Sequence, residues 1–398
     1  MKGKSNSIKK IGILTDYNGN TNYGGVLQAY ALQKIISSFG YGCEQIQYKF
    51  IISQKQKIQK SLYYFCARSF DEKIDLIKLW IKNGFKINKK KRVECDEIVQ
   101  ERNKKILLFS EGIPHTKTIY YSNTISSING KYDAFVVGSD IIWLPERVLF
   151  QNDKVFFLDF VRNGRKIAYA ASTGVSKLPH RFEKEVRRDL AGFDRLSVRE
   201  KSMASKIERL SEKEVASVLD PTMLISSKDW LDLFEIQEKN EEYIFCYFLG
   251  RDKKSRLISR KISEKKGQRL KVLRYANGRY CDVDDGFEAD YVDTIDPREF
   301  VETVLNSSLV ITDSFHGIAM SIVMGKEFLA IEREKESRVS FNSRINDILA
   351  TFDLRDRKIH DLDEAIKVLE KPIDYQDLES RLVELREYSL DWLKNSLE

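Results

Sequence analysis

Short apolar runs that alternate with amphipathic helical segments are the feature that most restricts what this chain can fold into. The run Leu309–Thr312 has the character of a buried strand, and the apolar helical segment 318–323 follows within a few residues. Similar strand-then-helix units recur along the chain, which is the pattern of a parallel sheet covered by helices. A chain of 398 residues also exceeds the length at which a single core keeps growing. We therefore predict an α/β fold with two Rossmann-like domains that face a cleft.

The predicted boundary between the two domains lies near residue 225. The first domain then spans 1–225, with a basic helical insertion at about 51–110, and the second spans 226–398 and ends in a helix. Most expected strands end in small or charged residues, as is typical where the carboxyl ends of strands line a binding site. The expected strands are 11–15, 43–48, 134–137, 167–170, 196–198 and 216–219 in the first domain, and 243–250, 271–275, 291–293, 309–312 and 328–331 in the second.

The charge of the chain is moderately basic. Lys and Arg number 67 against 60 Asp and Glu, a formal net charge of +7, which is too small an excess to indicate nucleic acid as a partner. In the basic insertion, Ile74, Ile77, Trp80 and Ile81 recur at helical spacing. This pattern has two interpretations, a solvated helix with an ordinary apolar stripe or a helix that lies on an anionic membrane surface.

Several classes of protein are disfavoured by what the sequence lacks. The five cysteines are dispersed without a C-x-x-C pair or a His at metal spacing, so we expect no disulfide framework and no metal site. The loop after the first strand is neither G-x-G-x-x-G nor a P-loop, which argues against a nicotinamide cofactor. Since we find no signal-peptide pattern and no apolar run of eighteen residues, we expect a cytoplasmic protein, or a peripheral one at the inner face of the membrane.

The segment Asp313–Gly317 is the strongest candidate for a functional site. Ser314 is a good N-cap, so a helix start is expected directly after the strand 309–312. Such a helix start directs backbone N–H groups and the positive end of the helix dipole toward an anion. His316 lies there, and an ordinary imidazole can supply a proton near neutral pH. Asp313 either orients this imidazole or simply caps a loop.

Seven segments, in order along nearly the whole chain, resemble the polysaccharide pyruvyl transferase family. The resemblance implies a GT-B-like fold, phosphoenolpyruvate as the donor substrate, and no further cofactor. The implied acceptor is a sugar of a cell-surface (exopolysaccharide or capsular) polysaccharide or of its lipid-linked precursor, which receives pyruvate as a ketal bridging two hydroxyls. The segments are YNGNTNYGGVLQAYALQ, YDAFVVGSDIIWLP, IAYAASTG, LSVREKS, VLDPTML, ITDSFHGIAMSIVMGKEF and NSRINDIL.

The chemistry of this reaction suggests a role for each candidate residue. Ketal formation needs a proton donor, cations for a carboxylate and a phosphate, and groups that bind sugar hydroxyls. The expected catalytic residues are His316 and Asp313. The expected donor-binding residues are Arg199, Ser314, Phe315, Gly317, Arg333 and Arg344, and the expected acceptor-binding residues are Asp16, Asn18, Asn22, Tyr23, Ser139, Asp140 and Trp143.

Two departures from the family pattern leave alternatives open. Ser314 stands where better-known members have arginine, and Ile141 stands where the relatives that this chain most resembles have glutamine. Arg333, Arg338 or Arg344 can compensate for the missing arginine. The alternatives are a GT-B glycosyltransferase that uses a nucleotide sugar and a catalytically silent sugar-phosphate binding protein.

Overall fold

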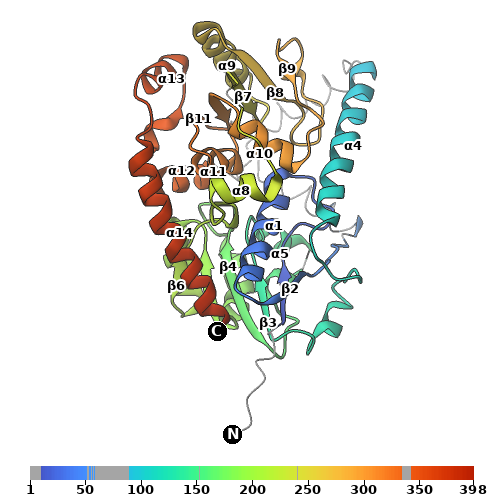
Figure 1. The fold of residues 1–398 in the computed structure, drawn as a ribbon. Helices are drawn as coiled ribbons and strands as arrows, with labels where there is room; N and C mark the ends of the chain where they lie inside the picture. Colours follow the sequence, from blue (N-terminus) through green and yellow to red (C-terminus); the bar gives the residue numbers. More distant parts are fainter. Residues whose placement is uncertain are drawn as a thin grey trace. The chain divides into compact units, whose positions relative to one another are not determined.

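The computed structural model describes residues 10–51, 53–54, 56, 58, 89–151, 153–239, 241–333 and 342–398. The chain divides into two compact units, each with its own parallel sheet (Figure 1). No helix in these described ranges is long and apolar enough to cross a membrane. Unit 1 consists of Met1–Ser53, Phe109–Ile225 and Val383–Glu398, and unit 2 consists of Gln54–Leu108 and Ser226–Leu382.

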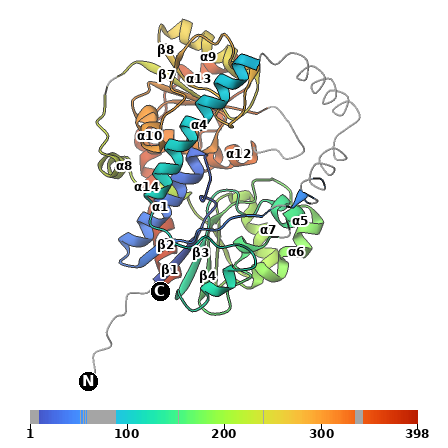
Figure 2. The same ribbon diagram turned by 90° about the vertical axis from the view of Figure 1, so that its right-hand side faces the viewer.

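The sheet of unit 1 has six parallel strands in the order β2-β1-β3-β4-β5-β6. The chain moves from β1 to β2 on one side and then returns to β3 on the other, so the topological switch point lies between β1 and β3. Helices α1 and α6 lie on opposite sides of this sheet (Figure 2). The strands are β1 (Lys10–Leu14), β2 (Gly42–Gln45), β3 (Ala134–Val137), β4 (Arg165–Ala171), β5 (Arg195–Val198) and β6 (Val215–Ser217). The helices are α1 (Tyr23–Ser38), α5 (Pro145–Gln151), α6 (His180–Ala191) and α7 (Lys201–Ser211), with 3₁₀ turns η1 (Ile125–Ile128), η2 (Val155–Phe157) and η3 (Pro221–Met223).

The sheet of unit 2 also has six parallel strands, in the order β12-β11-β10-β7-β8-β9. This is the Rossmann order, whose switch point lies between the first and fourth strands, here β7 and β10. The strands are β7 (Tyr243–Tyr247), β8 (Arg269–Leu273), β9 (Asp290–Tyr291), β10 (Leu309–Thr312), β11 (Phe328–Ile331) and β12 (Lys358–Ile359). The helices are α8 (Ser227–Phe234), α9 (Lys253–Lys266), α10 (Pro297–Leu305), α11 (Phe315–Val323), α12 (Asn342–Thr351) and α13 (Leu362–Leu369), with 3₁₀ turns η4 (Asp282–Asp284) and η5 (Arg355–Arg357). Helices α4 (Lys89–Glu111) and α14 (Tyr375–Leu397) each begin in unit 2 and end in unit 1. Two parallel sheets of this kind confirm the predicted α/β fold with two Rossmann-like domains.

The units divide between residues 225 and 226, but the basic insertion is placed differently from our prediction. We assigned the basic insertion to the first domain, whereas its described residues 54, 56, 58 and 89–108 belong to unit 2. The reason is the side chain of Arg102 on α4, which is 2% exposed. Its guanidinium donates to the carbonyls of Arg274 (2.8 Å), Tyr275 (2.6 Å) and Asp293 (3.3 Å), all in unit 2. The last part of α14, from Val383, belongs to unit 1.

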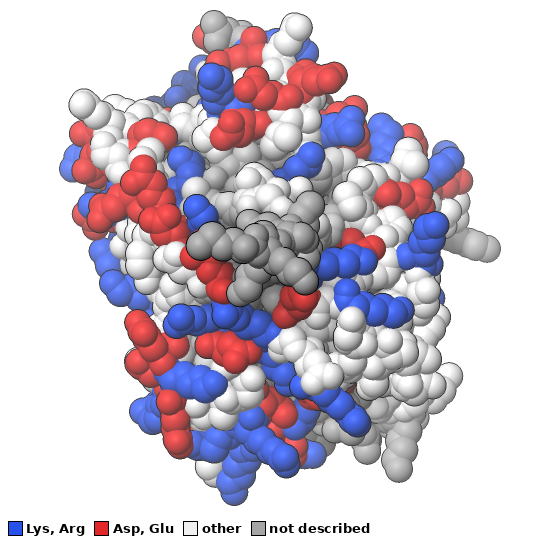
Figure 3. Space-filling model, turned by 60° about the horizontal axis from the view of Figure 1, so that its bottom comes forward, with Lys and Arg blue, Asp and Glu red and all other residues white. Residues whose placement is uncertain are grey.

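The predicted apolar stripe of Ile74, Ile77, Trp80 and Ile81 lies outside the described residues. On the face that Figure 3 displays, Lys and Arg side chains are interspersed with Asp and Glu side chains. That face therefore does not present a patch of one sign.

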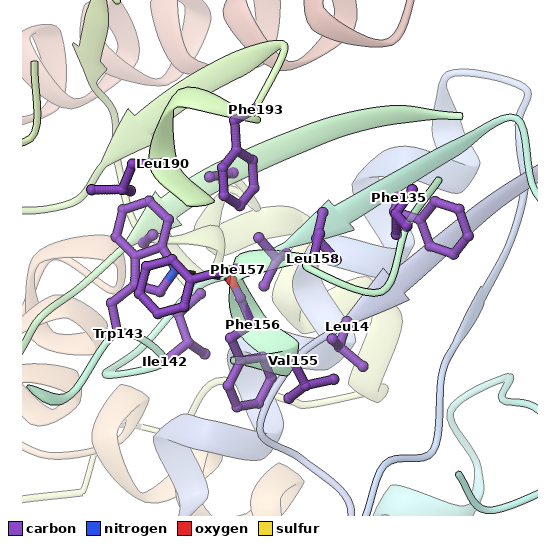
Figure 4. Packing of buried hydrophobic residues seen from close by; sticks show 14 of the residues in the cluster. Leu14, Phe135, Ile142, Trp143, Val155, Phe156, Phe157, Leu158, Leu190 and Phe193 are labelled. Atoms are coloured by element: carbon purple, nitrogen blue, oxygen red, sulfur yellow. Dashed lines mark hydrogen bonds between the residues drawn. The ribbon is translucent and has the colours of Figure 1, made fainter. Parts of the chain in front are cut away.

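Trp143 belongs to the hydrophobic core of unit 1. The residue is fully buried, and its indole stacks on Phe157 with 5.4 Å between ring centroids and 9° between planes (Figure 4). The indole N–H donates to the carbonyl of Phe156 at 2.9 Å. We predicted that Trp143 would offer an aromatic face to an acceptor sugar. That prediction is wrong, because both the ring and its one polar atom are already used inside the core.

Candidate functional site

The switch point of unit 2 is held together by the carboxylate of Asp313. One of its oxygens accepts from the backbone N–H of Leu249 and the other from that of Gly250, both at 2.7 Å. Asp313 follows β10 and these two amides follow β7, so the carboxylate ties the two loops of the switch point. Of the two roles considered for Asp313, the geometry favours loop capping.

Helix α11 begins at this point, and its first turn carries His316. Ser314 caps the helix, and its side-chain oxygen accepts from the N–H of Gly317 at 3.5 Å. Ser314 is itself fixed because its N–H donates to the hydroxyl of Thr312 at 3.1 Å. His316 is 5% exposed and meets the ring of Phe315 edge to face, with 5.1 Å between centroids. The imidazole thus lies at the positive end of a buried, apolar helix.

Gly317 allows α11 to approach β10 closely. A Cβ atom on Gly317 would lie 2.5 Å from the hydroxyl oxygen of Thr312, nearer than side chains tolerate. That hydroxyl donates to the carbonyl of Tyr247 on β7 at 2.6 Å, so it has little freedom to move. Gly317 therefore has a structural reason to be glycine, apart from any contact with a donor.

Arg333 brings positive charge to the same point. Its Nε donates to the carbonyl of Asp313 at 3.0 Å and lies 3.4 Å from the Asp313 carboxylate. The Arg333 side chain is 19% exposed. Arg344, in the first turn of α12, is buried at 8% exposure, and Arg338 lies outside the described residues. Arg333 is thus the candidate cation that the structure places next to the helix start.

Gly250 is a site residue that the sequence analysis missed, having placed it at the end of a strand. A Cβ atom there would lie 2.8 Å from Oδ2 of Asp313 and 3.4 Å from Cγ of Arg333. We expect Gly250→Ala to lower the free energy of unfolding by about 1–3 kcal/mol, the usual cost of overpacking. Urea denaturation measures this cost. The same substitution in an Asp313→Ala background should cost less, and equal costs in both backgrounds would contradict the contact.

Most of the predicted acceptor residues lie in the loops at the switch point of unit 1. After β1, Asp16 forms an ion pair with Arg147, and the Asn18 amide donates to the carbonyl of Tyr48 at 3.2 Å. Asn22 caps α1, and its side-chain oxygen accepts from the N–H groups of Gly24 and Gly25 at 3.0 and 3.3 Å. Tyr23 is 2% exposed. Tyr23 is therefore buried, whereas Asp16, Asn18 and Asn22 keep partial exposure. The side-chain oxygen of Asn22 is already used in capping α1, so Asp16 and Asn18 are the better candidates for contact with an acceptor.

The other side of this switch point contains a buried charge cluster centred on Arg199. Its guanidinium lies 2.9 Å from Asp220, 3.2 Å from Glu200 and 3.9 Å from Asp140, and the side chain is 3% exposed. Ser139, fully buried, donates through its hydroxyl to Asp220 at 3.0 Å. Burial alone would lower the pKa of Arg199, but the three carboxylates outweigh it and raise that pKa above its usual value.

This cluster changes the interpretation of Arg199. We predicted that it would bind the carboxylate or phosphate of a donor, but its charge is already compensated by acidic side chains. A further anion would have to overcome the repulsion of those carboxylates. Arg199 is therefore better described as a positioning residue that holds Asp140, Glu200 and Asp220. In the sequence, Asp220 could have been recognised as a candidate site residue because it follows the expected strand 216–219 and precedes Pro221.

Among the described residues, no group of three or more His, Cys, Asp or Glu side chains is arranged so that it could hold a metal ion. In the Arg199 cluster the guanidinium itself balances the charge of the three carboxylates.

Comparison with solved structures finds many distant similarities. The structure of UDP-GlcNAc 2-epimerase from Neisseria meningitidis bound to UDP-GlcNAc has a TM-score of 0.48 and 12% identity, with 96% of this chain and 98% of that chain covered. The UDP-GlcNAc 2-epimerase from Methanocaldococcus jannaschii has a TM-score of 0.48 and 9% identity, with 92% of each chain covered. The E. coli heptosyltransferase WaaC with ADP has a TM-score of 0.40 and 10% identity, with 92% of this chain and 100% of that chain covered.

Comparison of the sequence is more informative about the family. A search of curated proteins gave no match. The family model for polysaccharide pyruvyl transferase matches residues 22–335, which include Arg199 with its acidic partners and the helix start at Ser314, but not β1. Since this match takes in most of the sequence, the chain belongs to the polysaccharide pyruvyl transferase family.

Proposed function

We propose that the protein transfers pyruvate from phosphoenolpyruvate to a sugar of a cell-surface polysaccharide, or of its lipid-linked precursor, as a ketal. The observation that carries this proposal is the helix start at the unit 2 switch point, where an imidazole and a guanidinium lie beside a helix N-terminus. Open α/β sheets bind ligands at such switch points, and helix N-termini favour phosphate. The family membership supports transfer of pyruvate to a polysaccharide.

The proposed reaction begins with proton transfer from His316. The imidazole gives its proton to the methylene carbon of phosphoenolpyruvate, and C2 becomes oxocarbenium-like. One sugar hydroxyl attacks C2, the phosphate leaves, and a second hydroxyl completes the ketal while the two hydroxyl protons pass to basic groups or solvent. The sum is one phosphoenolpyruvate and one diol giving one ketal and one inorganic phosphate.

The binding roles follow from the two switch points. In unit 2 the first turn of α11, which Ser314 caps and which contains Phe315 and Gly317, binds the phosphate at the positive end of the helix, and Arg333 binds the anionic donor. In unit 1 the partly exposed Asp16 and Asn18 hold the acceptor sugar, and the Arg199 cluster presents Asp140 to it. Asp140 keeps 15% side-chain exposure, unlike Asp220, which is fully buried.

Donor binding through Arg333 can be tested directly. Arg333→Met should weaken phosphoenolpyruvate binding about tenfold or more, since a lost charge-assisted hydrogen bond costs about 1.5–3 kcal/mol. Isothermal titration with phosphoenolpyruvate measures the change. Arg355→Met is the matched control, because Arg355 is 68% exposed and pairs only with Asp353 among the contacts of the described residues. Equal affinities of the two variants would contradict the donor site.

A further inference from the structure

A cavity of about 250 Å³ opens in unit 1 among three loop segments. Its walls come from Tyr48, which follows β2, from segment 122–126, which precedes β3, and from segment 153–162, which precedes β4. Of the residues that line it, Tyr48 alone contacts the site described above, through the carbonyl that accepts from Asn18. The volume is below the range usual for pockets that hold drug-sized ligands, so it suits a single ring.

The lining of this cavity is polar but carries no net charge. Two carboxylates, Asp153 and Asp159, are balanced by two cations, Lys154 and Arg162. Tyr48 and two serines add hydroxyl groups, and Phe160 with two aliphatic side chains adds apolar surface. Groups of this kind, which accept and donate hydrogen bonds around a small apolar wall, match the alternating hydroxyl and C–H surface of a pyranose. A neutral lining favours an uncharged ligand over a sugar phosphate or an amine.

The walls of the cavity are held in place before any ligand arrives. The Tyr48 hydroxyl donates to Asp153, whose other oxygen accepts from the N–H of Val155 at 3.0 Å. Lys154 is fixed by Asp189 at 2.8 Å and by the carbonyl of Glu185 at 2.7 Å. Preorganised groups lose little entropy on binding, which favours recognition of a small polar ligand.

Tyr48 also connects the cavity with the proposed acceptor loop. Tyr48 lines the cavity, and its hydroxyl donates to Asp153 there, while its backbone carbonyl accepts from the Asn18 amide at 3.2 Å. A saccharide chain whose reacting sugar lies at Asn18 would therefore place a neighbouring sugar within reach of the cavity. We propose that this cavity is a second saccharide subsite, which binds an uncharged hexopyranose unit of the acceptor next to the unit that reacts. The proposal rests on the proposed function for the identity of the acceptor.

The binding can be tested without the transfer reaction. Saturation-transfer NMR and titration calorimetry on the full chain, with methyl β-galactopyranoside and methyl β-glucopyranoside as probes, should detect binding of at least one of them. Ser126→Leu extends an exposed side chain into the cavity and should weaken this binding at least about tenfold. Ser127→Leu is the control, since Ser127 is exposed in the same turn but does not line the cavity. Should Ser126→Leu fail to fold, Asp159→Asn serves as the second variant.

The possible outcomes separate this proposal from the proposed function. Absence of binding by both glycosides, or equal binding by the Ser126→Leu and Ser127→Leu variants, would overturn the subsite. Tighter binding of glucosamine or glucose 6-phosphate at the cavity would overturn the assignment of an uncharged ligand. Phosphate release from phosphoenolpyruvate with a monosaccharide acceptor is measured separately and should be unaffected by Ser126→Leu. The subsite can therefore fail while transfer stands, and transfer can fail while the subsite stands.

Discussion

Replacing Arg199 with methionine should lower the free energy of unfolding by about 3–5 kcal/mol, the usual cost of removing one partner from a buried ion pair. The variant would leave Asp140, Glu200 and Asp220 close together without their shared cation. Urea denaturation measures the loss, and hydrogen exchange should place it in unit 1.

The control for this prediction is an exposed arginine. Arg187→Met removes a pair with Glu212 at 3.9 Å, in which the side chains are 55% and 83% exposed. Such surface pairs contribute little, so the change should stay within about 0.5 kcal/mol. If Arg199→Met cost no more than Arg187→Met, the cluster would not be the structural centre that its geometry indicates.

Replacing His316 with asparagine should reduce turnover with phosphoenolpyruvate by about 10²–10⁴-fold, the usual contribution of a general acid. Asparagine is polar and smaller, so the helix start and its backbone N–H groups should remain. Phosphoenolpyruvate should therefore bind with an affinity close to that of the natural protein. Phosphate release measures turnover, and calorimetry measures binding.

His180→Asn is the matched control for this substitution. The His180 side chain is 80% exposed at the start of α6 in unit 1, and it lies 3.9 Å from Glu183. Its turnover should be unchanged. Turnover of the His316→Asn variant close to that of the natural protein would show that another group supplies the proton.

The fold was largely predictable because buried parallel strands are short apolar runs between turn residues. The strands 134–137, 309–312 and 328–331 have the predicted bounds. The two-residue strand β12 and helix α13 were not predicted. A two-residue strand has no periodicity to detect, and its pairing with β11 is decided by tertiary contacts.

The candidate site was predictable only in part. The sequence shows which polar residues follow a strand, and the parallel topology brings those ends to one edge of each sheet. It does not show where a side chain points. Trp143 is in the core because Phe157 and Phe193 pack around it, and Arg199 is neutralised by Asp220, 21 residues away along the chain. Both outcomes depend on contacts between distant segments, which residue spacing does not encode.

The most direct test of the account is to follow the methylene carbon of the donor in heavy water. The protein would be incubated with phosphoenolpyruvate labelled with ¹³C at C3 and with a panel of hexopyranosides in D₂O, and the products examined by NMR. We predict a ketal methyl group that carries one deuterium, formed together with inorganic phosphate, and much more slowly with the His316→Asn variant. A product that keeps its methylene group would contradict protonation at C3, and absence of any sugar product would contradict pyruvyl transfer.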